Sequence, residues 1–202
     1  MSTGTAPQAG FTPRQRVLAA AYGLFTRRGV RDVGVDEIIT SSQVAKATFY
    51  RHFPSKNELV LAVLDERERV WTRGLVEAGA RQRGSTPTGR LLGIFDVFDD
   101  WFGRPDDFDG CSFINVLLEM GGDHPLGQAS IGYLANIRTI VREWAEEAGL
   151  RDPDEFARSW HILMKGSIVS AAEGDTAAAQ RAKQMAGWLI DHHRQPPPLP
   201  AR

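Results

Sequence analysis

The sequence predicts an all-α protein of about nine helices, with three short helices at the N-terminus and a larger helical body after them. Three observations support this fold class. Apolar residues recur at three- and four-residue spacing in most segments, residues that favour helix ends bracket those segments, and no strand-like alternation of apolar and polar residues is found. A chain of 202 residues is long enough to bury a sizeable core.

The first helix is expected from Pro13 to Arg28. Thr12 suits the N-cap and Pro13 the first turn, and apolar residues then follow at helical spacing until Gly29, which favours a helix end. The letters VDEIITSS after Gly34 predict a short second helix, because two acidic residues in its first turn complement the helix dipole.

A third helix is expected in AKATFYRHF, residues 45–53, and Pro54 ends it. Ser55 and Glu58 have the capping-box pattern of a fourth helix, which we expect to run to about Ala80. The remaining helices are expected within residues 90–102, 111–120, 126–148, 154–172 and 177–193. The Pro-rich tail at 195–202 is expected to be extended or disordered.

Basic residues are concentrated near the N-terminus. Residues 11–60 hold eight Lys or Arg against four Asp or Glu, whereas the whole chain has a formal net charge of −1. The overall charge therefore says nothing about nucleic acid. The asymmetry makes the N-terminal part the candidate for binding a polyanion.

The second and third helices, with a tight turn between them, have the pattern of a helix-turn-helix, whose second helix enters the DNA major groove. Val44, Phe49 and Phe53 supply the apolar face that docks this helix on its neighbours. The outer face carries polar or cationic groups at Lys46, Thr48, Tyr50, Arg51 and His52. The alternative is an ordinary three-helix subdomain with a solvated basic face.

The stretch VDEIITSSQVAKATFYRHFPSKNEL resembles the DNA-binding signature of TetR-family transcriptional repressors. The resemblance covers about residues 12–64, and the rest of the chain resembles the family in length and helix count. It is carried by Phe25, Gly29, Val35, Ile38, Val44, Lys46, Thr48, Phe49, Tyr50, His52, Phe53, Lys56 and Leu59.

This resemblance implies DNA contacts for particular residues. It implies phosphate contacts for Tyr50, His52 and Lys56, and base contacts for Lys46, Ala47 and Thr48. It also implies that Arg14 touches a flanking phosphate or the minor groove.

Four positions depart from the family pattern. Gly34 replaces a hydroxyl that caps the second helix and touches phosphate, and Gln43 replaces the glycine of the turn. Ala45 replaces a capping serine, and Ala47 stands where glycine is common. Because a Gln side chain can read adenine, Gln43 is itself a candidate DNA-contacting residue.

The expected organisation is a DNA-binding domain at 12–56, an effector-binding and dimerisation domain at 57–194, and the tail. The family resemblance implies a small-molecule pocket, for which the sequence offers an apolar and aromatic set: Phe95, Phe98, Trp101, Phe102, Phe113, Leu117, Met120, Trp160 and Met164. Possible polar anchors are Cys111, Asn115, Glu119 and His161. The alternative is that these aromatic residues are plain core.

The resemblance also implies a homodimer through the last two helices, residues 154–193. Gly166, Ser167 and Ser170 would allow close helix approach, while Ile168, Met185, Trp188 and Leu189 would add apolar area. An intramolecular core is the alternative.

Enzyme chemistry, metals and cofactors are not indicated. The chain has one cysteine, Cys111, no phosphate-binding or nucleophile motif, and no histidines at metal-ligand spacing. No signal peptide or membrane span is predicted, so a cytoplasmic location is expected. The function expected is a homodimeric repressor on palindromic double-stranded DNA, released by a small hydrophobic effector. The alternative is a small-molecule-binding or assembly protein with weakened DNA binding.

Overall fold

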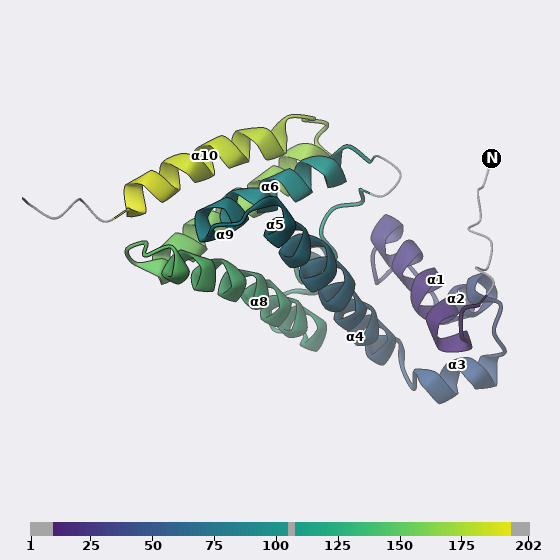
Figure 1. The fold of residues 1–202 in the computed structure, drawn as a ribbon. Helices are drawn as coiled ribbons and strands as arrows, with labels where there is room; N and C mark the ends of the chain where they lie inside the picture. The colour runs from purple at the N-terminus through teal and green to yellow at the C-terminus, as the bar shows by residue number, and fades with distance from the viewer. Residues whose placement is uncertain (1–9, 105–107, 195–202) are drawn as a thin grey trace, which may run out of the picture. The chain divides into compact units, whose positions relative to one another are not determined.

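The computed structural model describes residues 10–104 and 108–194, so the predicted tail at 195–202 lies outside the described residues. Within these ranges the chain is all-α, as predicted, and no strand occurs. In order, the elements (Figure 1) are α1 Pro13–Arg28, α2 Val35–Ser42, α3 Lys46–His52, α4 Lys56–Arg67, η1 Glu68–Glu77, α5 Ala78–Arg83, α6 Pro87–Phe102, α7 Ser112–Met120, α8 Pro125–Glu147, α9 Pro153–Ala172 and α10 Ala178–His193.

The described residues form two compact units. The first unit contains the chain up to Arg67 together with Ser112–Ile131, and therefore α1 to α4, α7 and the start of α8. The second contains Glu68–Cys111 and the residues from Gly132 onward. The boundary expected between residues 56 and 57 divides the chain into a DNA-binding domain and an effector-binding domain. That division is by function, not by packing, and it stays a prediction.

Helix α1 organises the first unit, because α2, α3 and α4 all pack against it. The helix begins as predicted: Thr12 Oγ1 accepts from the Gln15 N–H, and the Gln15 side chain accepts from the Thr12 N–H, at 3.3 and 2.9 Å. The core between these helices is fully buried at Val17, Ala21, Ile38, Phe49 and Leu59.

The predicted fourth helix is present but changes register partway. Segments α4, η1 and α5 follow one another directly from Lys56 to Arg83; counted as one, they give nine helices over the ranges that the structure describes. Segment η1 is a π-helix, and its buried residues Trp71, Thr72 and Val76 lie four and five residues apart. That spacing aligns side chains in a π-helix better than in an α-helix. The π register begins where the chain passes into the second unit.

In the second unit, α10 packs against α9 and α6, and α5 packs against α6. The core is aromatic: Phe95, Phe98, Trp144, Phe156 and Trp160 have no exposed surface. No helix in the described parts of the chain has the length and apolar character needed to cross a membrane.

Candidate nucleic-acid interface

The turn between α2 and α3 forms without the expected glycine. Gln43 adopts the left-handed conformation there, with φ 53° and ψ 44°. A residue with a Cβ is disfavoured in this region, typically by about 1 kcal/mol. The departure from the family pattern at Gln43 therefore costs some stability but keeps a left-handed turn, and its side chain is exposed beside α3.

The inner face of α3 holds the helix in place. Phe49 and Phe53 are 0% and 2% exposed, and their ring centroids lie 6.0 Å apart. The Arg14 guanidinium lies 5.5 Å from the Phe53 ring centroid, which is within the range of a cation–π contact. This contact places Arg14, at the start of α1, beside the end of α3.

The outer face of α3 is accessible. Lys46, Ala47 and Tyr50 are exposed, while Thr48 and His52 are half-buried. Lys56 begins α4, whose first turn is capped by Ser55 Oγ accepting from the Glu58 N–H at 3.1 Å. We call the set Gln43, Lys46, Ala47, Thr48, Tyr50, His52 and Lys56 the recognition face. Arg14 adjoins it through Phe53, and the DNA contact of each residue stays a prediction.

Two of the eight basic residues in residues 11–60 have carboxylate partners. Arg28 pairs with Glu37 at 2.5 Å, and Lys46 Nζ pairs with Asp36 Oδ1 at 3.1 Å. The hydrogen bond from Lys46 to Asp36, with the negative charge of that carboxylate, raises the pKa of Lys46. The other six have no ion pair with any described residue: Arg14, Arg16, Arg27, Arg31, Arg51 and Lys56. Sequence reasoning missed the Asp36 contact, because it assigned Asp36 only to the helix dipole.

The start of α2 is uncapped. Gly34 occupies the N-cap with φ −81° and ψ 152°, and no side chain can bond the helix there. A Cβ built on Gly34 meets no atom within 4 Å. Glycine is therefore not required at this position, and a hydroxyl residue would fit.

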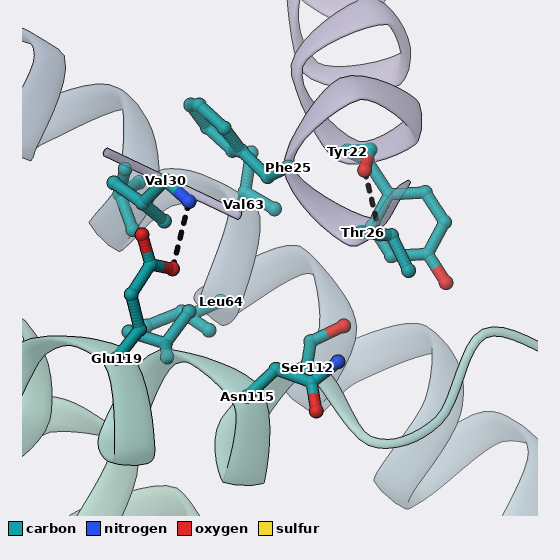
Figure 2. Close-up of a pocket in the computed structure, with 11 residues that line it drawn as sticks. Tyr22, Phe25, Thr26, Val30, Val63, Leu64, Ser112, Asn115 and Glu119 are labelled. Atoms are coloured by element: carbon teal, nitrogen blue, oxygen red, sulfur yellow. Dashed lines mark hydrogen bonds between the residues drawn. The ribbon is translucent and has the colours of Figure 1, made fainter. Parts of the chain in front are cut away.

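A second feature of the first unit ties α7 to the chain after α1. Gly29 turns the chain with φ 83°, and the next two backbone N–H groups, of Val30 and Arg31, donate to the Glu119 carboxylate at 2.8 and 2.6 Å. Figure 2 shows the Glu119 side chain reaching up from α7 to Val30. Charge-assisted hydrogen bonds of this kind are stronger than neutral ones. Glu119, predicted as an effector anchor, thus has both oxygens engaged.

A small pocket lies beside this contact, between α1, α4 and α7 (Figure 2). Its walls include Tyr22, Phe25, Val63 and Asn115. The cavity measures about 20 Å³, which is room for about one water molecule. Ligand sites for drug-sized molecules typically exceed about 300 Å³, so this pocket is too small for the expected effector.

The nine predicted effector residues divide between the units. Phe113, Leu117 and Met120 lie on α7 in the first unit. The other six lie in the second unit and are buried except for Phe102, which is half-buried: Phe95, Phe98, Trp101, Phe102, Trp160 and Met164. Their rings meet in a chain of contacts, with Phe98 5.6 Å from Phe102 and Phe95 5.3 Å from Trp160. Burial of this kind suits both a pocket wall and a core.

Helices α9 and α10 expose large apolar side chains in the second unit. Ile162 and Trp188 are 69% and 63% exposed, and Val169 and Met185 are about half exposed. We call these four the apolar face. Two residues expected at this surface lie elsewhere: Ser167 and Ile168 are buried in the unit's own core, because they lie on the opposite side of α9.

Comparisons with known proteins place these features in context. Residues 17–63 match the model of the family described as bacterial regulatory proteins, tetR family. A TetR transcriptional regulator from Streptomyces avermitilis is 30% identical, covers 91% of this chain and 98% of its own, and superposes with a TM-score of 0.79. A TetR-family transcriptional regulator from Streptomyces coelicolor superposes with a TM-score of 0.82 at 27% identity, over 91% of this chain and 96% of its own.

Curated proteins with similar sequences are also transcriptional regulators. The transcriptional regulator AcuR of Cereibacter sphaeroides is 27% identical over 82% of this chain and 78% of its own length. Two further curated regulators align over 54% and 53% of their own lengths. All three are named as regulators of transcription.

Proposed function

Since the chain belongs to the TetR family of bacterial regulatory proteins, we propose that it is a homodimeric transcriptional repressor that a small hydrophobic effector releases from a palindromic operator. DNA-binding regulation of transcription is what its relatives share. The observation that carries the proposal is the recognition face, an exposed helix surface with basic residues in and around it, of which Arg14, Arg51 and Lys56 have no carboxylate partner among the described residues. It would act in the cytoplasm, where the DNA lies.

The recognition face suits a major groove. Lys46, Ala47 and Thr48, in the first turn of α3, would meet base edges, since the early residues of a recognition helix reach them. Tyr50, His52 and Lys56, later in the chain, would meet phosphates. Two copies of α3 in a dimer would then read half-sites about one helical turn, ~34 Å, apart.

The apolar face supports the dimer. Large apolar side chains gathered on adjacent helices usually mark an interaction site. Gly166 lies on α9 between Ile162 and Val169 and is exposed. A Cβ placed on it would meet no atom within 4 Å, so a second helix could approach closely there. Helices α9 and α10 of two protomers would form a four-helix bundle. Trp188→Asp is expected to convert the dimer to monomers in sedimentation velocity; an unchanged dimer would rule out this interface.

The effector would bind in the second unit, among its aromatic side chains, and α7 offers a route to the DNA-binding helices. The Glu119 contacts fix α7 to the residues that follow α1, so a shift of α7 would displace α1 and the helices packed on it. Glu119→Ala is expected to change DNA affinity several-fold although it lies outside the recognition face. Leu118→Ala is the matched control, because Leu118 is 79% exposed on the same helix. Equal effects of the two substitutions would refute this route.

The direct test is a mobility shift on the DNA upstream of the protein's own gene. We expect specific binding that Tyr50→Phe weakens, because the phenol hydroxyl is the predicted phosphate donor, and that Arg104→Gln leaves unchanged, because Arg104 is an exposed cation of the second unit. A reporter under the same DNA should rise in expression when the protein is absent.

The alternative, a binding or assembly protein with weakened DNA binding, has one observation in its favour. Neither α2 nor α3 has a side-chain cap, at Gly34 and Ala45. Absence of any specific mobility shift would favour this alternative over the repressor.

A further inference from the structure

Three polar side chains converge in the second unit, and none of them belongs to the recognition face or the apolar face. Arg138 comes from α8, and His161 and Lys165 lie one turn apart on α9. His161 is only 3% exposed, and its Nδ1 lies 3.4 Å from Arg138 Nη1. We call these three residues the basic cluster.

The geometry assigns a protonation state to His161. A guanidinium can only donate, so His161 Nδ1 must accept, and the imidazole proton then sits on Nε2. Burial, with the positive charges of Lys165 and Arg138, lowers the pKa of His161 to about 3. The ring is therefore neutral at physiological pH, and its Nε2–H has no hydrogen-bond partner within the described ranges.

The cations of this cluster lack the carboxylates that most others in the second unit have. Arg83 pairs with Asp100, Arg90 with Glu147 and Lys183 with Asp96. Neither Arg138 nor Lys165 pairs with an acid anywhere in the described residues, although both are half-buried. Burial and the nearby Arg138 charge lower the pKa of Lys165. Two like charges brought together without a counter-charge are destabilising, and a bound anion would relieve the repulsion.

A buried unsatisfied group lies next to the cluster in sequence. The indole N–H of Trp160, the residue before His161, is buried without a hydrogen-bond partner in the described structure. Most buried polar groups in folded proteins are hydrogen-bonded, so an orphan donor calls for an unseen water or ligand.

We propose that the basic cluster binds the carboxylate of a small organic acid, which is the effector of this regulator. The proposal rests on the repressor function above and names the chemical class of its ligand. The Arg138 guanidinium matches a carboxylate through parallel N–H donors, Lys165 adds a point charge, and the His161 Nε2–H adds a neutral donor. Met164 and Trp160, buried on the same helix, suit an apolar body attached to the acid.

The test is direct titration of the protein, without DNA, by isothermal calorimetry. The probes are benzoate, phenylacetate and hexanoate, with benzamide as the uncharged match of benzoate and inorganic phosphate as an anion without an apolar body. We expect at least one carboxylate to bind and benzamide and phosphate to bind at least tenfold more weakly. No binding of any carboxylate up to ~10 mM, beyond the range of ordinary small-ligand affinities, would overturn the proposal. Phosphate binding as tight as the best carboxylate would overturn it as well.

Variants then assign the site. Arg138→Gln and Lys165→Met should each weaken carboxylate binding at least tenfold. Arg142→Gln is the matched control, because Arg142 lies one turn along α8 and carries the same charge but pairs with Glu146. Thermal unfolding of each variant shows that it is folded. Equal loss in Arg138→Gln and Arg142→Gln would overturn the assignment.

The two proposals fail separately. Carboxylate binding that depends on Arg138 in a protein with no specific DNA binding would leave the site standing and refute the repressor. Specific DNA binding without carboxylate binding would leave DNA recognition standing and refute the basic cluster as an effector site. Where both occur, the bound acid should weaken the DNA complex.

Discussion

The two units differ in how they treat their basic residues. In the first unit the basic residues near α3 are mostly exposed and without acidic partners, whereas in the second unit most arginines and lysines are paired with carboxylates. Among the exceptions in the second unit are Arg138 and Lys165 of the basic cluster, which is partly buried and narrow rather than broad and exposed. A broad exposed basic surface suits a polyanion such as DNA, while a narrow, partly buried cluster suits one small anion. From the unpaired positive charge we therefore expect two anion-binding surfaces of different size.

The largest expected effect tests the exposed basic residues of the first unit. Lys56→Ala should weaken binding to the DNA upstream of the gene by roughly tenfold to a hundredfold, because a dimer loses two phosphate contacts. The slope of log affinity against log salt should become shallower by about 1.8, since each contact contributes about 0.9. Fluorescence anisotropy over a salt series measures both. A variant with weaker binding but an unchanged slope would show that Lys56 acts through structure rather than charge.

The second prediction concerns folding stability and comes from His161 in the basic cluster of the second unit. The folded-state pKa of His161 is about 3, below its ordinary value of 6.5. As the pH falls, His161 is therefore protonated in the unfolded chain before it is protonated in the folded protein. The contribution of His161 to folding stability is therefore complete above pH 6.5 and is lost as the pH falls toward 3. The free energy of unfolding should fall by about 1.4 kcal/mol for each pH unit lost in that window.

Urea unfolding between pH 7 and pH 5 measures this loss, with His161→Gln as the reference, since the variant cannot titrate at that position. The charged groups that face His161 are Arg138 and Lys165. Parallel pH profiles for the two proteins would contradict the assignment of a neutral buried ring.

A smaller effect is expected from the pair that covers Lys46. Asp36→Asn removes a negative charge from the edge of the recognition face and frees Lys46. DNA affinity should rise by about threefold to tenfold, because electrostatic attraction to phosphate increases. Asp65→Asn, an exposed carboxylate on α4, is the matched control and should leave affinity unchanged. Weaker binding in Asp36→Asn would mean that the pair positions Lys46 for DNA rather than competing with it.

The smallest effect belongs to the uncapped start of α2. Gly34→Ser should raise the free energy of unfolding by a few tenths to about 0.5 kcal/mol, because serine caps better than glycine and the site is open. Gly34→Ala has no hydroxyl and should be slightly destabilising. Differential scanning calorimetry of both variants separates the hydroxyl from the Cβ. If serine and alanine shift the melting temperature equally, capping is not the cause.

Local signals predicted most of the fold. Thr12, Pro13 and Gly29 marked α1 because caps act within one turn of the residue that makes them. Phe49 and Phe53 were assigned correctly to the buried side of α3 because helical spacing alone separates the two faces of a short helix. These features need no knowledge of distant residues.

The rest depends on tertiary packing and could not be predicted locally. The π register of η1 contains no proline, and which of its side chains are buried at four- and five-residue spacing depends on what packs against the segment. The contact of Glu119 with Val30 joins residues 89 positions apart, so no window of sequence contains it. The convergence of Arg138 on His161 also requires α8 and α9 to meet. The predicted aromatic residues are buried except for Phe102, but burial does not distinguish a ligand wall from a core, so their effector contacts stay a prediction.

The measurement that bears most directly on the account is the salt dependence of wild-type binding to its upstream DNA. If Arg14, Arg51 and Lys56 of each protomer face phosphates in a dimer, about six charge contacts form, and the slope of log affinity against log salt should be about −5. A slope near zero, or no specific binding at all, would contradict the claim that this exposed positive charge exists to bind DNA.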